Sequence, residues 1–117
     1  MSSREWTFRV QDILEAIEKV SRYVENMTLT QFKENELVMD AVIRNFEIIG
    51  EASKNIPLSI RRSYPEVPWN EMSGMRNVLI HEYFGVDVGT VWHTTKKNLP
   101  KLQKQLRAIL KEVKASK

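Results

Sequence analysis

The stretch that decides the fold is LVMDAVIRNFEIIGEA, residues 37–52. Its apolar residues recur every three or four positions, which is the spacing along one face of an α-helix. They are Leu37, Val38, Ala41, Val42, Phe46, Ile49 and Ala52. The pattern predicts a long helix from about Asn35 to Ser53, ended by Pro57. Gly50 lies within this pattern, and glycine there makes a helix about 1 kcal/mol less stable than alanine would. We therefore expect that its small size is needed because a neighbouring backbone approaches closely.

The segment before this helix carries the same periodicity. Its apolar stripe consists of Phe8, Ile13, Leu14, Ile17, Val20 and Val24. The steps of three and four predict a second long helix over about residues 4–25. Thr28 or Thr30 is expected to cap a short helical turn that runs through Phe32.

Further helices are predicted after Pro57. We expect one short helix near residues 59–64, and then a helix that Asn70 caps and Gly85 ends. Residues 88–97 are predicted to form another helix. A last helix should start near Pro100, because proline is tolerated in a first turn, unless both form one kinked helix.

The chain shows no alternating strand pattern, no Asn-Gly hairpin turn and no internal repeat. The periodicity therefore predicts an all-α fold, an up-and-down helical bundle of about four main helices with additional short helices. Its 117 residues are the usual size of one domain, so we expect residues 1–117 to form a single domain. Hydrophobic residues make up 42% and charged residues 28%, which is typical of globular rather than disordered proteins.

The sequence contains no cysteine. Disulfides, thiolate zinc sites and cysteine nucleophiles are therefore excluded, and a cytoplasmic location is expected. The first residues contain no apolar run of signal-peptide length, and no apolar run is long enough to span a bilayer. We therefore expect no membrane contact.

The net charge is +3, and much of the excess lies in the C-terminal segment. Its basic residues are Lys96, Lys97, Lys101, Lys104, Arg107, Lys111, Lys114 and Lys117. They alternate with leucine, isoleucine and valine at helical spacing, which favours a solvated helix face. Contact with nucleic acid is the alternative explanation, and the sequence leaves both open.

The segment most informative about chemistry is RNVLIHEYFGVD, residues 76–87. Arginine presents a planar fork of donors that fits phosphate, and histidine exchanges protons near neutral pH. On an ideal helix Asn77 and His81 share a face, whereas Arg76 and His81 point about 140° apart. The helix could end near His81, the long Arg76 side chain could reach round, or two copies of the site could face each other. We favour a homodimer, since a two-fold axis brings a second Arg76 and His81 to one cleft.

These residue types suit metal-free cleavage of RNA. The 2′-hydroxyl of RNA is the nucleophile, so the protein must supply a base, an acid and a cation. Paired His81 imidazoles would serve as base and acid, and Arg76 would hold the non-bridging phosphate oxygens as negative charge builds on them. With two histidines, no cysteine and no dense carboxylate cluster, we expect no protein-built metal site and no cofactor.

Taken singly, such residues have ordinary structural explanations. A lone arginine is more often ion-paired at a surface, and a lone histidine more often has a structural hydrogen bond. Tyr83 could anchor a helix, and Asn77 could bond locally. His93 is interpreted as a structural or surface residue, and Trp69 and Trp92 as packing residues.

A second polar group lies on the predicted helix that ends near Ser53. Arg44, Glu47 and Glu51 are spaced so that they share one helix face. They could form an internal polar ladder or line a cleft, and we favour the ladder.

The segment GMRNVLIHEYFGVD, residues 74–87, resembles the HepT-like toxins, a branch of the HEPN superfamily. Their mark is an R-x-x-x-x-H-x-Y motif, which residues 76–83 match. A second block, residues 41–52, is similar to the long second helix of the family, and residues 67–69 fit as well. The resemblance covers about residues 8–110, and two separated blocks in the right order make it specific.

The resemblance implies a HEPN-like helical bundle that forms a homodimer and acts as a metal-independent endoribonuclease. Carried over residue by residue, the catalytic residues are Arg76 and His81, with Asn77 as the polar residue after the arginine. Family members are usually toxins of two-gene toxin–antitoxin systems, and the antitoxin is a minimal nucleotidyltransferase. In some members this partner transfers AMP to the motif tyrosine, which is Tyr83 here. A nucleotide on Tyr83 would add bulk and negative charge where an RNA phosphate must sit.

Two other functions fit part of the pattern. A non-catalytic helical module that binds a nucleotidyltransferase or a nucleotide would use Arg76 and Tyr83 for docking, although it would not need the whole motif. A bundle with no active site would explain the periodicity and leave residues 76–83 to coincidence. The expected partners are therefore an RNA substrate, the nucleotidyltransferase antitoxin and a second copy of the chain.

Overall fold

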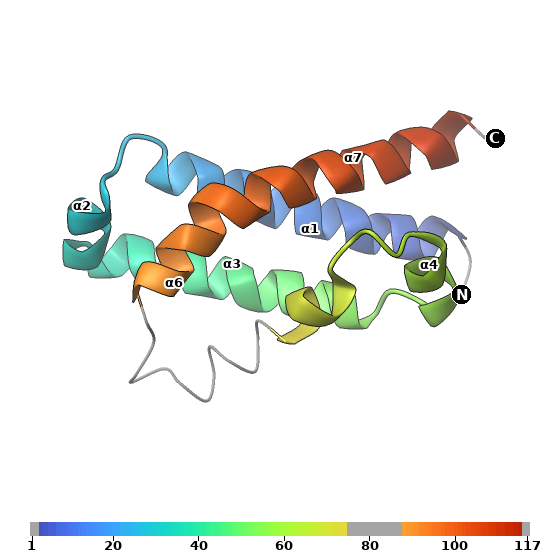
Figure 1. Ribbon diagram of the computed structural model, residues 1–117, viewed down its shortest axis with the longest axis horizontal. Coiled ribbons are helices and arrows are strands. Elements are labelled where there is room, and N and C mark those ends of the chain that lie inside the picture. Colours follow the sequence, from blue (N-terminus) through green and yellow to red (C-terminus); the bar gives the residue numbers. More distant parts are fainter. Residues whose placement is uncertain (1–2, 75–87, 116–117) are drawn as a thin grey trace.

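The chain folds into long and short helices in a computed structural model, which describes residues 3–74 and 88–115 (Figure 1). The long helices are α1 (Ser3–Val24), α3 (Glu36–Lys54) and α7 (Leu99–Ala115). The shorter elements are α2 (Leu29–Glu34), α4 (Leu58–Ser63), α6 (Val88–His93), the π-helical turn η2 (Thr94–Asn98) and helical residues 69–74. None of the residues in these two ranges forms a strand, which confirms the all-α prediction.

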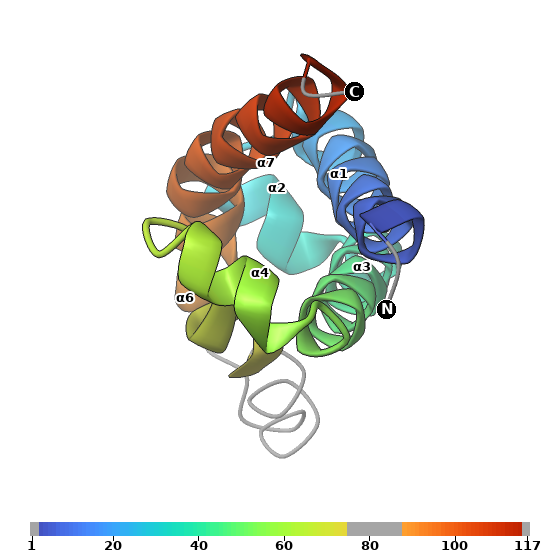
Figure 2. The same ribbon diagram turned by 90° about the vertical axis from the view of Figure 1, so that its right-hand side faces the viewer.

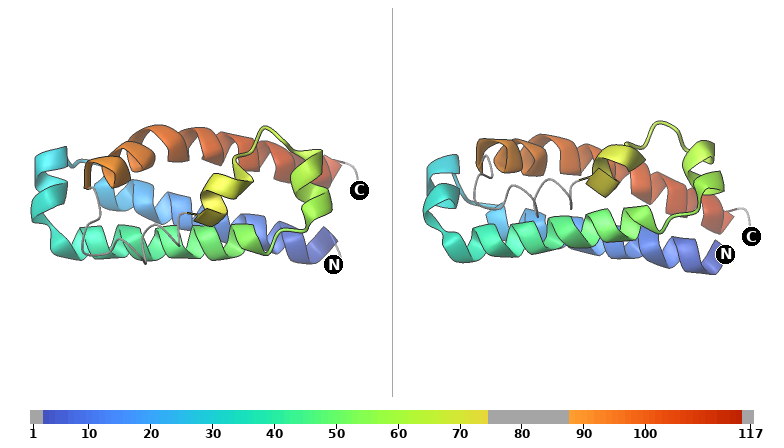
Figure 3. Two further views of the ribbon diagram at one scale, coloured as in Figure 1. Left: turned by 60° about the horizontal axis from the view of Figure 1, so that its bottom comes forward. Right: turned by 90° about the horizontal axis from the view of Figure 1, so that it is seen from below.

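The centre of the bundle is the antiparallel pair α1 and α3. Helix α7 packs along α1, and α4 lies across the end of the bundle that holds the N-terminus (Figures 2 and 3). The core that these helices share includes Val10, Ile13, Ile17, Val20, Val42, Phe46, Ile49, Leu102 and Leu106. The helical faces predicted from the periodicity therefore meet as a bundle requires.

Two residues assigned to those apolar faces are largely exposed. The side chain of Leu37 is 82% exposed and that of Phe8 is 48% exposed. The reason is helical phase: at 100° per residue, Leu37 points about 120° away from buried Ile49, and Phe8 about 140° away from buried Ile13. Gly50 is buried within α3, and the close backbone approach proposed for it stays a prediction.

Side-chain caps fix two of the helix starts. The Thr28 hydroxyl accepts a hydrogen bond from the Gln31 amide at 3.2 Å, and the Gln31 side chain accepts one from the Thr28 amide at 2.9 Å. This capping box begins α2, as predicted for Thr28. Asn35 caps α3 by accepting a bond from the Val38 amide at 3.0 Å. The predicted start of the long helix is thereby confirmed.

The expected cap at Asn70 is wrong. Trp69 is already helical, and the carbonyl of Pro68 accepts a hydrogen bond from the Met72 amide at 3.0 Å. The helix therefore begins before Asn70, because proline can precede a first turn without leaving a donor unpaired. The predicted end of this helix, at Gly85, lies outside the described residues.

The C-terminal end of α3 is closed by a guanidinium from α4. Arg61 donates to the carbonyls of Ile56 at 3.0 Å, Ser53 at 3.2 Å and Lys54 at 2.7 Å. The last carbonyls of a helix have no partner within the helix, so a cation there satisfies them and complements the helix dipole.

Residues 88–115 form one interrupted helix, which was the alternative to two separate helices in the sequence analysis. Between α6 and α7 the backbone stays helical but widens into η2. From this turn Lys96 donates to the carbonyl of Val24 at 3.0 Å, and its ammonium lies 4.8 Å from the centre of the Trp92 ring. The Trp92 ring in turn lies 5.2 Å from that of Phe32 in α2. These contacts tie the end of α1 to α2 and η2, and they confirm Trp92 as a packing residue.

Candidate functional site

The residues predicted to carry chemistry are Arg76, Asn77, His81 and Tyr83, and all four lie outside the described residues. What the structure describes is the chain on either side of them. Helical residues 69–74 lead to the segment, and α6 follows it. The predicted roles of the four residues therefore stay predictions.

The helix that leads to the segment is anchored in the core. Trp69 is 5% exposed and Met72 is 2% exposed. The Trp69 indole donates from Nε1 to the carbonyl of Tyr64 at 3.0 Å, which satisfies its one polar group. Trp69 is thereby confirmed as a packing residue, and it fixes the position from which the chain continues to residue 75.

Two buried hydroxyls near this region have no hydrogen-bond partner in the described part of the chain. They are Oγ of Ser73, in the entering helix, and Oγ1 of Thr95 in η2. An unpaired buried hydroxyl costs free energy, and such groups are uncommon away from functional or strained positions. Single π-helical turns also occur frequently at functional sites. The periodicity of the sequence contained no signal for either feature.

A groove separates the entering helix from α7. It is lined by Glu66, Pro68, Glu71, Met72, Thr94, Asn98, Leu99, Lys101, Leu102 and Gln105. The Gln105 side chain bridges its walls by donating to the carbonyl of Glu66 at 3.1 Å. Acidic side chains lie on one wall and Lys101 on the other, so the groove is polar and of mixed charge.

A second polar groove lies between α1 and α3. Its charged lining residues are Arg9, Asp12, Glu15, Lys19, Arg44, Glu47 and Glu51. Arg44 pairs with Glu47 at 3.3 Å, and Lys19 pairs with Glu15 at 3.4 Å. The group Arg44, Glu47 and Glu51 thus lines a cleft and also contains the first rung of the predicted ladder.

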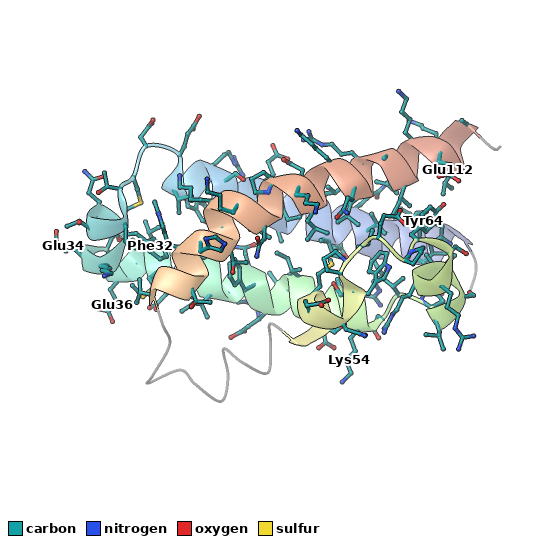
Figure 4. All side chains as sticks on the ribbon, in the orientation of Figure 1. Phe32, Glu34, Glu36, Lys54, Tyr64 and Glu112 are labelled. Atoms are coloured by element: carbon teal, nitrogen blue, oxygen red, sulfur yellow. The ribbon has the colours of Figure 1, made fainter. Side chains whose placement is uncertain are left out.

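Among the described residues, Tyr64 has a pKa that departs clearly from its usual value. Burial raises the pKa of its hydroxyl above the usual value of 10.0, and the carboxylates of Glu112 and Glu66 raise that pKa further. The hydroxyl also hydrogen-bonds Glu112. Figure 4 shows Tyr64 beside α7, close to Glu112. This contact joins the loop before Trp69 to the last helix.

The described residues also bear on the expectations for His93, for metal binding and for membrane-spanning helices. His93 is exposed at the end of α6, which agrees with its interpretation as a surface residue. Across residues 3–74 and 88–115, no group of three or more histidine and carboxylate side chains is arranged to hold a metal ion. No helix in those ranges has the length and apolar character needed to cross a bilayer.

Comparison with known protein families shows to which family this chain belongs. The family described as "Ribonuclease HepT-like" matches residues 13–109, which include most of α1, all of α3 and most of α7. The chain belongs to the HepT-like family. The resemblance inferred from the two sequence blocks is confirmed, and with it the enzyme class of this HepT-like chain, which is that of the ribonucleases.

Several relatives of this HepT-like chain are close to it in length. One from Methanocaldococcus jannaschii, named "Putative RNase MJ1216", is 42% identical over 113 residues, or 97% of this chain and 93% of the relative. One from Thermococcus cleftensis, named "Probable ribonuclease HepT", is 45% identical over 102 residues, or 87% and 93%.

A longer relative also matches. The M. jannaschii protein named "Gamma-glutamylcyclotransferase and putative RNase MJ0434" is 45% identical over 101 residues, which are 86% of this chain. The match covers 46% of that relative, so the HepT-like chain spans about half of its length. No solved structure matches the chain.

Proposed function

We propose that this HepT-like chain is a metal-independent endoribonuclease and the toxin of a two-gene toxin–antitoxin system in the cytoplasm. The observation that carries the proposal is the intact R-x-x-x-x-H-x-Y motif at residues 76–83, inside the region that matches the ribonuclease family. Relatives that are named as ribonucleases and match over nearly their whole length support RNA as the substrate.

The proposed reaction uses the nucleophile that RNA carries. One His81 imidazole takes the proton of the 2′-hydroxyl, and the 2′-oxygen forms a bond to phosphorus. The bond from phosphorus to the 5′-oxygen breaks, and a second, protonated imidazole gives its proton to that oxygen. The products are a 2′,3′-cyclic phosphate and a free 5′-hydroxyl. Arg76 holds the non-bridging oxygens as their charge grows, and Asn77 orients one reacting group.

The proposed assembly is a homodimer of the single domain 1–117, with one cleft shared by two copies of the motif. The support is the helical geometry of the motif, since Arg76 and His81 of one straight helix diverge by about 140°. A minimal nucleotidyltransferase is the proposed antitoxin, and Tyr83 is the proposed acceptor of AMP. The added phosphate would repel RNA from Arg76.

The test is to incubate the purified protein with total RNA in excess EDTA, beside His81→Ala and Arg76→Ala. We expect cleavage with 2′,3′-cyclic phosphate ends by the wild type, and loss of cleavage by both variants with unchanged circular dichroism. An intact mass should first establish that Tyr83 carries no nucleotide. No cleavage by this unmodified protein would favour the non-catalytic partner module instead.

A further inference from the structure

Charge is divided unevenly between two parts of the chain. Residues 3–74 contain nine basic and twelve acidic residues, whereas residues 88–115 contain seven basic and one acidic residue. The first part has a net charge of −3 and the second a net charge of +6. The overall charge of +3 therefore conceals an acidic body and a strongly basic last helix.

Most of this positive charge lies on the outer face of η2 and α7, which we call the α7 ridge. Its members are Lys97, Lys101, Lys104, Arg107, Lys111 and Lys114, and all six are exposed. The five within α7 fall in an arc of about 140° at 100° per residue. The buried residues Leu99, Leu102, Leu106 and Ile109 occupy the opposite side of the helix.

The charges of the α7 ridge are not neutralised by described neighbours. The ion pairs in the described part of the chain join Lys19 to Glu15 and Arg44 to Glu47, and none includes a ridge residue. Glu112, the one acidic residue on α7, hydrogen-bonds Tyr64 at the side of the ridge. Lys96 is not a member of the ridge, because it is held by Val24 and Trp92.

The shape and composition of the ridge select one kind of partner. From Lys97 to Lys114 it extends about 25 Å at 1.5 Å per residue, which fits a polymer of charges better than a small anion. Its exposed face has no large hydrophobic residue, since the exposed ones in the described chain are Phe8, Tyr23, Leu37 and Leu58. Protein interfaces are enriched in aromatic residues and depleted in lysine, whereas a phosphate backbone needs only positive charge.

We propose that the α7 ridge binds the phosphate backbone of the RNA substrate and holds it along the outside of α7. This inference rests on the proposed ribonuclease function and adds the surface that positions the substrate. The groove beside Lys101 is not the path, because Glu66 and Glu71 on its far wall repel phosphate. The wall opposite Lys101 belongs to helical residues 69–74. RNA bound to the ridge therefore lies beside the helix from which the chain continues into the motif segment.

The test measures binding separately from cleavage. The probe is a fluorescent single-stranded RNA of about 30 nucleotides with 2′-O-methyl groups, which has no nucleophile and binds mainly through its phosphates. The ridge variant is the triple substitution Lys101→Gln, Lys104→Gln and Lys111→Gln. We expect its Kd at low salt to rise at least tenfold. The slope of log Kd against log salt should become shallower by about 2, since each phosphate contact on a single strand contributes about 0.7.

Two matched variants serve as controls. The triple substitution Arg22→Gln, Lys33→Gln and Lys54→Gln removes the same charge from exposed residues outside the ridge and should keep the wild-type Kd. The triple substitution Lys101→Arg, Lys104→Arg and Lys111→Arg should also keep the wild-type Kd, because the charge remains. The proposal is wrong if the ridge triple and the control triple lose RNA binding equally, or if neither of them loses it.

The remaining outcomes are also distinguishable. If sedimentation shows that the ridge substitutions dissociate a self-associated form while RNA binding is unchanged, the ridge contacts the acidic body of a second copy and the proposal is wrong. Cleavable RNA tests the ribonuclease function separately. Wild-type protein that binds the probe but leaves cleavable RNA intact contradicts the proposed function, not the ridge.

Discussion

At the scale of single residues, the proposed role of Arg76 depends on geometry as well as charge. Lysine at this position keeps the charge but loses the planar fork that holds two phosphate oxygens at once. We predict that Arg76→Lys lowers kcat by about 10- to 100-fold, less than Arg76→Ala, since losing one donor to a developing oxyanion costs about 100- to 1,000-fold. Single-turnover cleavage in EDTA measures this difference. Equal rates for wild type and Arg76→Lys would leave Arg76 only a charge role.

Tyr64 gives a second prediction at this scale, concerning stability and pH. Its hydroxyl stays protonated more readily in the folded protein than in the unfolded chain, because burial and two carboxylates raise its pKa above 10.0. The stabilisation is therefore complete below pH 10.0 and declines as the pH rises toward the folded-state pKa. We predict that Tyr64→Phe costs about 1 kcal/mol near neutral pH, through the lost hydrogen bond to Glu112.

The measurement is the free energy of unfolding in urea, taken near neutral pH and again above pH 10.0. The stability advantage of the wild type over Tyr64→Phe should shrink at the higher pH. A constant difference would show that the contact with Glu112 does not distinguish the two protonation states.

At the scale of elements, the join between α1 and η2 depends on Lys96. This side chain satisfies a terminal carbonyl of α1 and lies over the Trp92 ring. Methionine would keep the aliphatic stem and lose both polar contacts. We predict that Lys96→Met lowers the free energy of unfolding by about 1–2 kcal/mol, from one hydrogen bond and one cation–π contact. Lys97→Met, one position further on an exposed side chain, is the matched control and should change stability little.

The elements that were predicted correctly are those with local signals. Residues 37–52 specify α3 through their periodicity, and Asn35 supplies its cap, so the predicted start agrees with the structure. The helix cap predicted at Asn70 was wrong, because the helix already starts at Pro68, two residues earlier. The hydrogen bonds from Arg61 to the end of α3 and from Lys96 to Val24 depend on tertiary packing. The second of these joins residues that are 72 positions apart. Such contacts have no signature in local spacing.

At the scale of the whole molecule, family membership followed from two blocks of sequence, but the placement of charge did not. The sequence showed that the C-terminal segment is basic and left open whether that face binds nucleic acid. The structure adds that the ridge is exposed, unpaired among the described residues and free of large apolar groups. The candidate catalytic residues are different, since their evidence is the motif at residues 76–83 alone.

The widened turn η2 sets the rotational register of everything that follows it. A π turn closes its hydrogen bonds one residue later than an α turn and therefore contains one residue more. If Thr94–Asn98 closed as ordinary α turns with no residue removed, α7 would rotate by about 100° relative to α6. The ridge lysines would then turn toward a neighbouring helix, and part of the leucine face would turn outward. The widened turn thus absorbs one residue and keeps the leucine face inward, and a relative that lacked both that residue and the widening would form the same surface with an unshifted pattern of leucine and lysine.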